Sequence, residues 1–213
     1  MTVIALLAVL ALSAAVAGSA SANWFVGGTE LKTSAALATT TVVDEPSTLL
    51  VPTLSLSIVC SGKTLDGTSP EIIAGNIGKA ASLKFLECNT TKPATGCALE
   101  TANEPIPTLP VSARASLGSG EADRVLFVPQ TKGTFAEIKF SEADTCALGP
   151  ALILKGAVTF GAPTGQLELL NQAIVGLGSI ENNSLEIGSG NKAFIDGGKV
   201  LLRLASDSKW SFK

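Results

Sequence analysis

The sequence contains no histidine and no tyrosine, one methionine and only 5% aromatic residues. Without histidine, a Ser-His-Asp triad, a Cys-His dyad and a His-ligated metal site are all excluded. The 15 basic and 18 acidic residues give a net charge of −3, and the basic residues form no cluster. Nucleic-acid-binding proteins normally carry a basic patch. These absences predict a protein that is not an enzyme, uses no metal or other cofactor and does not bind nucleic acid.

The first 22 residues contain no charged side chain, and 17 of them are apolar. A run of Ile, Leu, Val and Ala over residues 4–16 is followed by small residues that end in Ala-Ser-Ala at 20–22, a motif for signal peptidase. The run is shorter than the roughly 20 residues of a membrane-spanning helix. We therefore expect residues 1–22 to be a signal peptide cleaved after Ala22. An uncleaved membrane anchor is the alternative.

The chain that remains after cleavage, residues 23–213, has no second long apolar run. It is therefore expected to lack an integral membrane span and to be secreted or held at the cell surface. The extreme N-terminus, Met1-Thr2-Val3, lacks the basic residue with which signal peptides normally begin. This departure predicts a translation start further upstream.

Four cysteines lie outside the leader, at Cys60, Cys88, Cys97 and Cys146. An even number in an exported chain is typical of two disulfide bonds. Their separations of 28, 9 and 49 residues match no Cys-x-x-Cys metal or redox motif. Three pairings are possible. We favour Cys88–Cys97, which would close a short loop, together with Cys60–Cys146 as a long-range link.

Apolar and polar residues alternate with a period of two over residues 53–60, 111–117, 134–140 and 199–205. This pattern is typical of antiparallel strands with one face on a core and one in water. Turn-forming residues separate such runs at spacings of roughly 8–15 residues. The sequence therefore predicts an all-β fold, an antiparallel sandwich or barrel of roughly 10–13 short strands with two disulfides.

Residues 23–213 are expected to form a single domain, with a seam near Pro150 as the alternative because turns become denser after it. The strongest hairpin signal is Asp196-Gly197-Gly198, which we expect to join residues 193–195 to the strand that begins at Lys199. Residues 89–110 are rich in Thr, Pro, Asn and Glu and are predicted to be an exposed loop.

Two acidic pairs stand out, Glu121 with Asp123 and Glu142 with Asp144. They could bind a cation or serve a carboxylate-dependent hydrolase, but calcium loops cluster three or more oxygen ligands at fixed spacing. We therefore favour solvated loops for both pairs. Residues 206–209 form a Ser-x-x-Lys string, which in penicillin-recognising enzymes begins a buried helix. No helical pattern surrounds it here, so we predict a polar turn.

Trp24 and Trp210 lie near opposite ends of the chain that follows the leader. They could line a ligand cavity. In small β proteins an isolated tryptophan more often fills a core or a barrel end, so we favour packing. If the terminal strands pair with each other, the two rings are expected to share one cluster.

Several short stretches occur in a recognisable order, namely Trp24–Gly28, Ile58–Cys60, Phe85–Cys88, Cys97, Phe127–Pro129, Gly133–Ile138, Cys146 and Lys155–Gly156. This order resembles that of a group of secreted, β-rich bacterial proteins, common in actinobacteria, that carry no assigned function. The resemblance would extend over most of the chain after the leader. It implies export, a β fold and disulfides, and it brings no catalytic residue.

The first functional hypothesis is therefore a secreted, non-catalytic β-domain with a structural or binding role at the cell surface or outside the cell. A barrel that carries a small apolar ligand is the second hypothesis, and it requires an apolar cavity larger than about 300 Å³. A carboxylate-dependent hydrolase is the third. Partners are not identified by the sequence, although unpaired edge strands would allow self-association.

Overall fold

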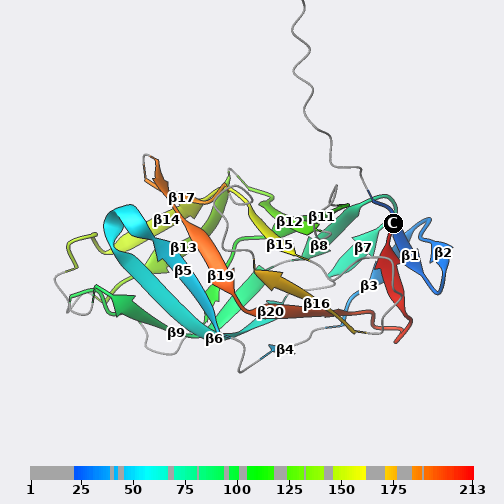
Figure 1. Cartoon of the computed structure of the whole chain (residues 1–213), viewed down its shortest axis with the longest axis horizontal. Coiled ribbons are helices and arrows are strands. Elements are labelled where there is room, and N and C mark those ends of the chain that lie inside the picture. Colours follow the sequence, from blue (N-terminus) through cyan, green and yellow to red (C-terminus); the bar gives the residue numbers. More distant parts are fainter. Residues whose placement is uncertain are drawn as a thin grey trace, which may run out of the picture.

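The computed structural model describes residues 22–38, 41–42, 46–66, 70–80, 82–93, 96–100, 105–117, 124–131, 133–141, 146–161, 171–176, 184–188 and 190–213. In this part of the chain the regular structure consists of β-strands and one short 3₁₀ turn, η1 (Pro52–Leu54). The strands pair antiparallel, which confirms the all-β fold class. The molecule is elongated, and its sheets follow one another along the long axis (Figure 1).

The largest sheet has eight strands in the order β20-β16-β15-β12-β11-β8-β7-β3. In chain order these strands are β3 (Ser34–Ala36), β7 (Glu71–Ile73), β8 (Ile77–Ala80), β11 (Val111–Ser116), β12 (Arg124–Pro129), β15 (Val158–Gly161), β16 (Asn171–Gly176) and β20 (Lys199–Arg203).

This sheet closes on itself, because its two outermost strands are joined just beyond their ends. Leu37, after β3, bridges Leu204, after β20. The Ala38 N–H donates to the Arg203 carbonyl at 2.7 Å, and the Ala205 N–H donates to the Ala36 carbonyl at 2.9 Å. The eight strands therefore form a closed antiparallel barrel, whose edges are satisfied by main-chain bonds.

A three-stranded sheet covers one end of the barrel, in the order β2 (Thr29–Glu30), β1 (Trp24–Val26) and β21 (Trp210–Phe212). The Trp24 and Trp210 ring centroids lie 5.6 Å apart in an edge-on arrangement, and Phe212 lies 5.3 Å from Trp24. Strands β1 and β21 pair antiparallel, and both tryptophans share one cluster, which the sequence suggested only for the case that the terminal strands pair. We call these three strands the barrel cap.

Each tryptophan also ties the barrel cap to a strand of the barrel. The Trp24 Nε1–H donates to the Ile77 carbonyl at 2.8 Å, and the Trp210 Nε1–H donates to the Leu202 carbonyl at 3.1 Å. Buried indole N–H groups normally find such a partner. The cap is therefore fixed to β8 and β20 by hydrogen bonds as well as by packing.

The other end of the molecule consists of two further sheets, which we call the disulfide half. One runs β10-β9-β6-β5-β19 with β4 alongside β6, and the other runs β13-β14-β17-β18. Their strands are β4 (Thr41–Val42), β5 (Ser47–Val51), β6 (Leu56–Asp66), β9 (Ser82–Lys92), β10 (Ile106–Pro107), β13 (Thr134–Lys139), β14 (Ala151–Lys155), β17 (Glu186–Ile187), β18 (Asn191–Lys192) and β19 (Phe194–Gly197). The bridge Thr108–Ala136 and the Leu109 N–H bond to the Phe135 carbonyl, at 2.8 Å, join the two sheets along one side.

Both disulfides lie in the disulfide half, as Cys60–Cys88 and Cys97–Cys146. Two disulfides were expected, but the favoured pairing of Cys88 with Cys97 and of Cys60 with Cys146 is wrong. Cys60 and Cys88 lie directly opposite each other on β6 and β9, with Cα atoms 4.0 Å apart. The preference for the shortest loop failed because Cys88 lies within a long strand, where its nearest partner is across the sheet.

The two longest strands, β6 and β9, contribute to both ends of the molecule. In β6, Ile58 and Cys60 face the disulfide half, whereas Leu65 packs inside the barrel. Up to Cys60, the even-numbered side chains of β6 are buried, and from Lys63 onward the odd-numbered side chains are buried. On the facing strand the same change occurs at Glu87, which has a left-handed φ of 48°. One hydrophobic core therefore runs through both ends of the molecule.

Left-handed residues also occur where the chain passes between the disulfide half and the barrel. Gly133 connects β12 to β13, Gly156 connects β14 to β15, and Gly198 connects β19 to β20, with φ values of 71°, 97° and 71°. Glycine adopts this conformation without the steric penalty of a Cβ atom. The chain changes sheets within one residue at Gly198, within two at Gly156 and within four between β12 and β13.

This use of glycine explains why the hairpin predicted at Asp196-Gly197-Gly198 is wrong. β19 pairs with β5 and β20 pairs with β16, so the strands on either side of the bend do not pair with each other. Because bends of this kind divide extended runs into separate strands, the described residues contain 21 strands, more than the 10–13 expected. The loop expected over residues 89–110 begins later, because β9 continues to Lys92. The single-domain assignment and the seam near Pro150 stay predictions.

Candidate functional site

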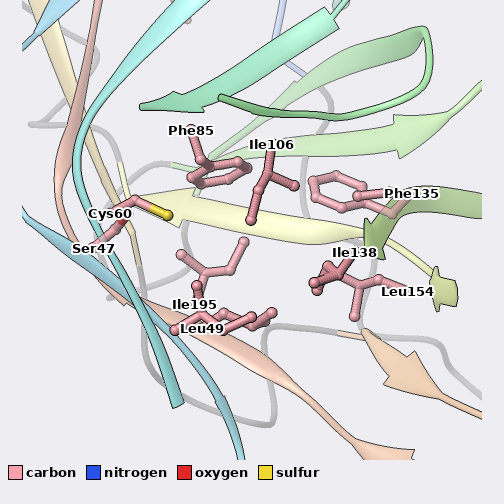
Figure 2. Close-up of a pocket in the computed structure, with 11 residues that line it drawn as sticks. Ser47, Leu49, Cys60, Phe85, Ile106, Phe135, Ile138, Leu154 and Ile195 are labelled. Carbon is pink, nitrogen blue, oxygen red and sulfur yellow. The ribbon is translucent and has the colours of Figure 1, made fainter. Parts of the chain in front are cut away.

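The space between the two sheets of the disulfide half contains a small apolar cavity of about 30 Å³. Figure 2 shows the side chains that converge on it from both sheets, with the Cys60 sulfur at one end. The lining residues are Ser47, Leu49, Ile58, Cys60, Phe85, Ile106, Phe135, Ala136, Ile138, Leu154 and Ile195. A volume of this size holds about one water molecule, and drug-sized ligands occupy pockets of roughly 300–1,000 Å³.

The barrel interior is filled in the same way. Its cavity measures about 20 Å³ and lies among Trp24, Ile72, Phe127 and Leu202. Phe127 and Phe160 meet edge to face, with centroids 5.5 Å apart. The two interiors of this molecule are therefore packed cores in the part of the chain that the structure describes.

A buried lysine lies where the two halves meet. The Lys63 side chain is fully buried on β6, and its Nζ atom lies 5.8 Å from the centroid of the Phe85 ring. A Cβ atom at Gly198 would lie 1.7 Å from that Nζ, so the bend between β19 and β20 provides the space for the ammonium group. Sequence analysis missed Lys63 because simple alternation from Cys60 places it on the outer face.

The larger hollows are open to solvent. One groove of about 360 Å³ runs between residues 105–109 and β13, with Glu100, Glu137 and Lys139 on its walls. A second, of about 330 Å³, lies beside η1 and is lined by Leu50, Leu56 and Lys92 among others. Both are surface features with mixed polar and apolar walls.

The acidic pairs Glu121–Asp123 and Glu142–Asp144 lie outside the described residues. The Ser-x-x-Lys string at 206–209 forms a turn, as predicted: Asp207 is left-handed with φ 55°, and its N–H donates to the Leu204 carbonyl at 3.0 Å. Within the described ranges, no group of three or more His, Cys, Asp or Glu side chains could hold a metal ion. No helix in the same ranges is long and apolar enough to span a membrane.

Comparison with protein-family models, with curated proteins and with solved structures found no match for this chain. The resemblance to secreted actinobacterial proteins therefore stays a prediction based on the sequence. Any function must be argued from the residues themselves.

Proposed function

We propose that this protein is an exported, non-catalytic β-domain that acts through its outer surface, in a structural or binding role at the cell surface or outside the cell. The observation that carries the proposal is the packing of the interior among the described residues, where the cavities measure about 30 and 20 Å³. A carrier of small apolar ligands would need an interior about ten times larger.

The two disulfides support the export part of the proposal. Disulfides form and persist in oxidising compartments and are rare in the cytosol. The Cys60–Cys88 bridge is buried, and in the second bridge Cys97 is buried while Cys146 is partly buried. The sequence provides a matching apolar leader. A stable scaffold with two bridges suits a protein that works away from cytosolic chaperones.

The proposal is tested by purifying the protein from its own host and measuring its native mass without reduction. We expect the extracytoplasmic fraction to contain the chain with both disulfides and no bound small molecule. A stoichiometric lipid or other apolar molecule would support the carrier hypothesis instead. A chain found only in the cytosol with four free thiols would contradict export.

A second experiment asks whether the cavity of the disulfide half is a ligand site or a packing defect. Ala136 is buried on its wall, so Ala136→Val adds methyl groups to the space. For a packing defect, we expect the free energy of unfolding to be unchanged or to rise by about 0.5–1 kcal/mol. For a ligand site, any molecule that co-purifies with the wild-type chain would be lost.

A further inference from the structure

Ala22, which ends the leader motif, is part of the folded domain. Its side chain is 0% exposed and packs in the hydrophobic core. The next residue, Asn23, exchanges two main-chain hydrogen bonds with Lys213, at 2.8 and 3.0 Å. Because alternate residues of a strand point the same way, Ala22 lies on the same face as the buried ring of Trp24. Ala22 therefore extends the inward face of the barrel cap by one residue.

Signal peptidase requires small residues at the first and third positions before the bond that it cleaves. Beyond the apolar run, the motifs with alanine directly before the bond end at Ala17, Ala20 and Ala22. Cleavage after Ala22 would remove a core residue from the mature chain. Cleavage after Ala17 would fall one residue beyond the apolar run, whose last residue is Val16, and leave almost no polar spacer.

We propose that the leader is removed upstream of Ala22, with Ala20–Ser21 as the expected bond, so that Ala22 remains in the mature protein. The inference rests on the proposed export, since only an exported chain meets signal peptidase. Leader removal precedes folding, so the burial of Ala22 does not protect the bond. Cleavage after Ala17 or after Ala20 keeps Ala22 on the inward face of the barrel cap, whereas cleavage after Ala22 removes it.

The direct test is the N-terminus of the exported protein from its own host, determined from its intact mass and its N-terminal peptide. A chain that begins at Ser21, or at Gly18, retains Ala22 and supports the inference. A chain that begins at Asn23 overturns it and leaves export intact. An unprocessed chain confined to the cytosol overturns both the inference and the proposed function.

Ala22→Asp provides a second test, with Ala36→Asp as the matched control because Ala36 is an exposed alanine on β3. If the cut lies upstream, we expect Ala22→Asp to be processed normally but to lose roughly 5–10 °C in Tm through its buried carboxylate. Ala36→Asp should stay within about 2 °C of the wild-type Tm. If Ala22 precedes the cut, Asp at that position blocks signal peptidase and unprocessed precursor accumulates. The two sizes are separable on a denaturing gel even if the variant does not fold.

Discussion

In the barrel, the outermost strands β3 and β20 are joined by main-chain hydrogen bonds, whereas in the disulfide half the irregular segment of residues 97–100 is held by main-chain hydrogen bonds and by a disulfide. There, the segment before residue 100 lies along β13: Glu100 N–H donates to the Lys139 carbonyl at 3.0 Å, and Ser141 N–H donates to the Ala98 carbonyl at 2.9 Å. Cys97–Cys146 ties that segment to the chain beyond β13.

The difference follows from how completely the strands of each region are paired with neighbouring strands. The barrel has a continuous ring of strands, so every strand has two neighbours, and edge closure needs no extra device. In the disulfide half, the segment of residues 97–100 pairs at the end of β13 through the isolated bridge Leu99–Phe140 and not through a full strand. A short irregular segment contributes little pairing energy, and a disulfide compensates by restricting the unfolded chain.

Removing Cys97–Cys146 by the paired change Cys97→Ser and Cys146→Ser is expected to have the largest effect. The bridge spans 49 residues, for which a loop-entropy model gives a loss of about 4 kcal/mol. Tryptophan fluorescence during guanidinium unfolding should report this loss, although both tryptophans lie in the barrel cap at the far end. We expect this because β6 and β9 carry one core through both halves. An unchanged fluorescence midpoint would show that the halves unfold independently.

Gly156→Ala tests the junction between β14 and β15. A Cβ atom there would lie 2.1 Å from the Ser184 carbonyl oxygen, at a φ of 97°. We expect a loss of about 3 kcal/mol from the clash and the backbone strain together. Gly190→Ala is the control, because Gly190 has a similar φ of 89° and nothing within 4 Å. It should lose only about 1–2 kcal/mol in the same denaturation assay, and equal losses would exclude the clash.

Ala38→Pro is aimed at the closure of the barrel. Proline has no N–H, so the bond of 2.7 Å to the Arg203 carbonyl is lost. We expect a destabilisation of about 2 kcal/mol, together with faster hydrogen exchange at the Ala205 amide, the other bond of the closure. Ala38→Ser keeps the N–H and should leave the exchange rate of Ala205 unchanged. Retained protection of Ala205 in the proline variant would show that the barrel stays closed without this bond.

Glu87→Val should give the smallest change in the free energy of unfolding. We expect a loss of stability, whereas strand propensity alone would predict a gain. Valine normally favours strands, but a β-branched residue is strained at the left-handed φ of 48°. The change also removes the 2.6 Å bond from the Ser61 hydroxyl to the Glu87 carboxylate. We expect a loss of about 1–2 kcal/mol. Asn89→Val, at an exposed position on the same strand, should be neutral or stabilising, and a neutral Glu87→Val would contradict the argument for a strained junction.

Much of the fold could be predicted from local sequence signals. The period-two pattern located β11 and β13 within one or two residues. A turn signal was recognised at Gly197 and Gly198, where φ values of 70° and 71° bend the chain, although the hairpin predicted there is wrong. These features depend only on neighbouring residues, so the sequence records them directly.

The pairing of distant segments could not be predicted in the same way. The bend at Gly198 leads into another sheet, Cys88 bonds to Cys60, and Lys63 is buried because the strand pair turns its other face inward near Glu87. Whether the interior can hold a ligand depends on its cavity volume, and no local sequence pattern predicts that volume. The acidic pairs that the sequence offered lie outside the described residues.

The sequence by itself determined the β class of this protein through its alternation, and the absence of histidine excludes histidine chemistry. The tertiary structure decided which cysteines pair, that the largest sheet closes into a barrel, and that the described part of the interior is packed. The physical reason is that periodicity and turn preference act between near neighbours, whereas closure and packing depend on contacts between residues far apart in the chain. Strand partners are chosen when the whole core is buried at once.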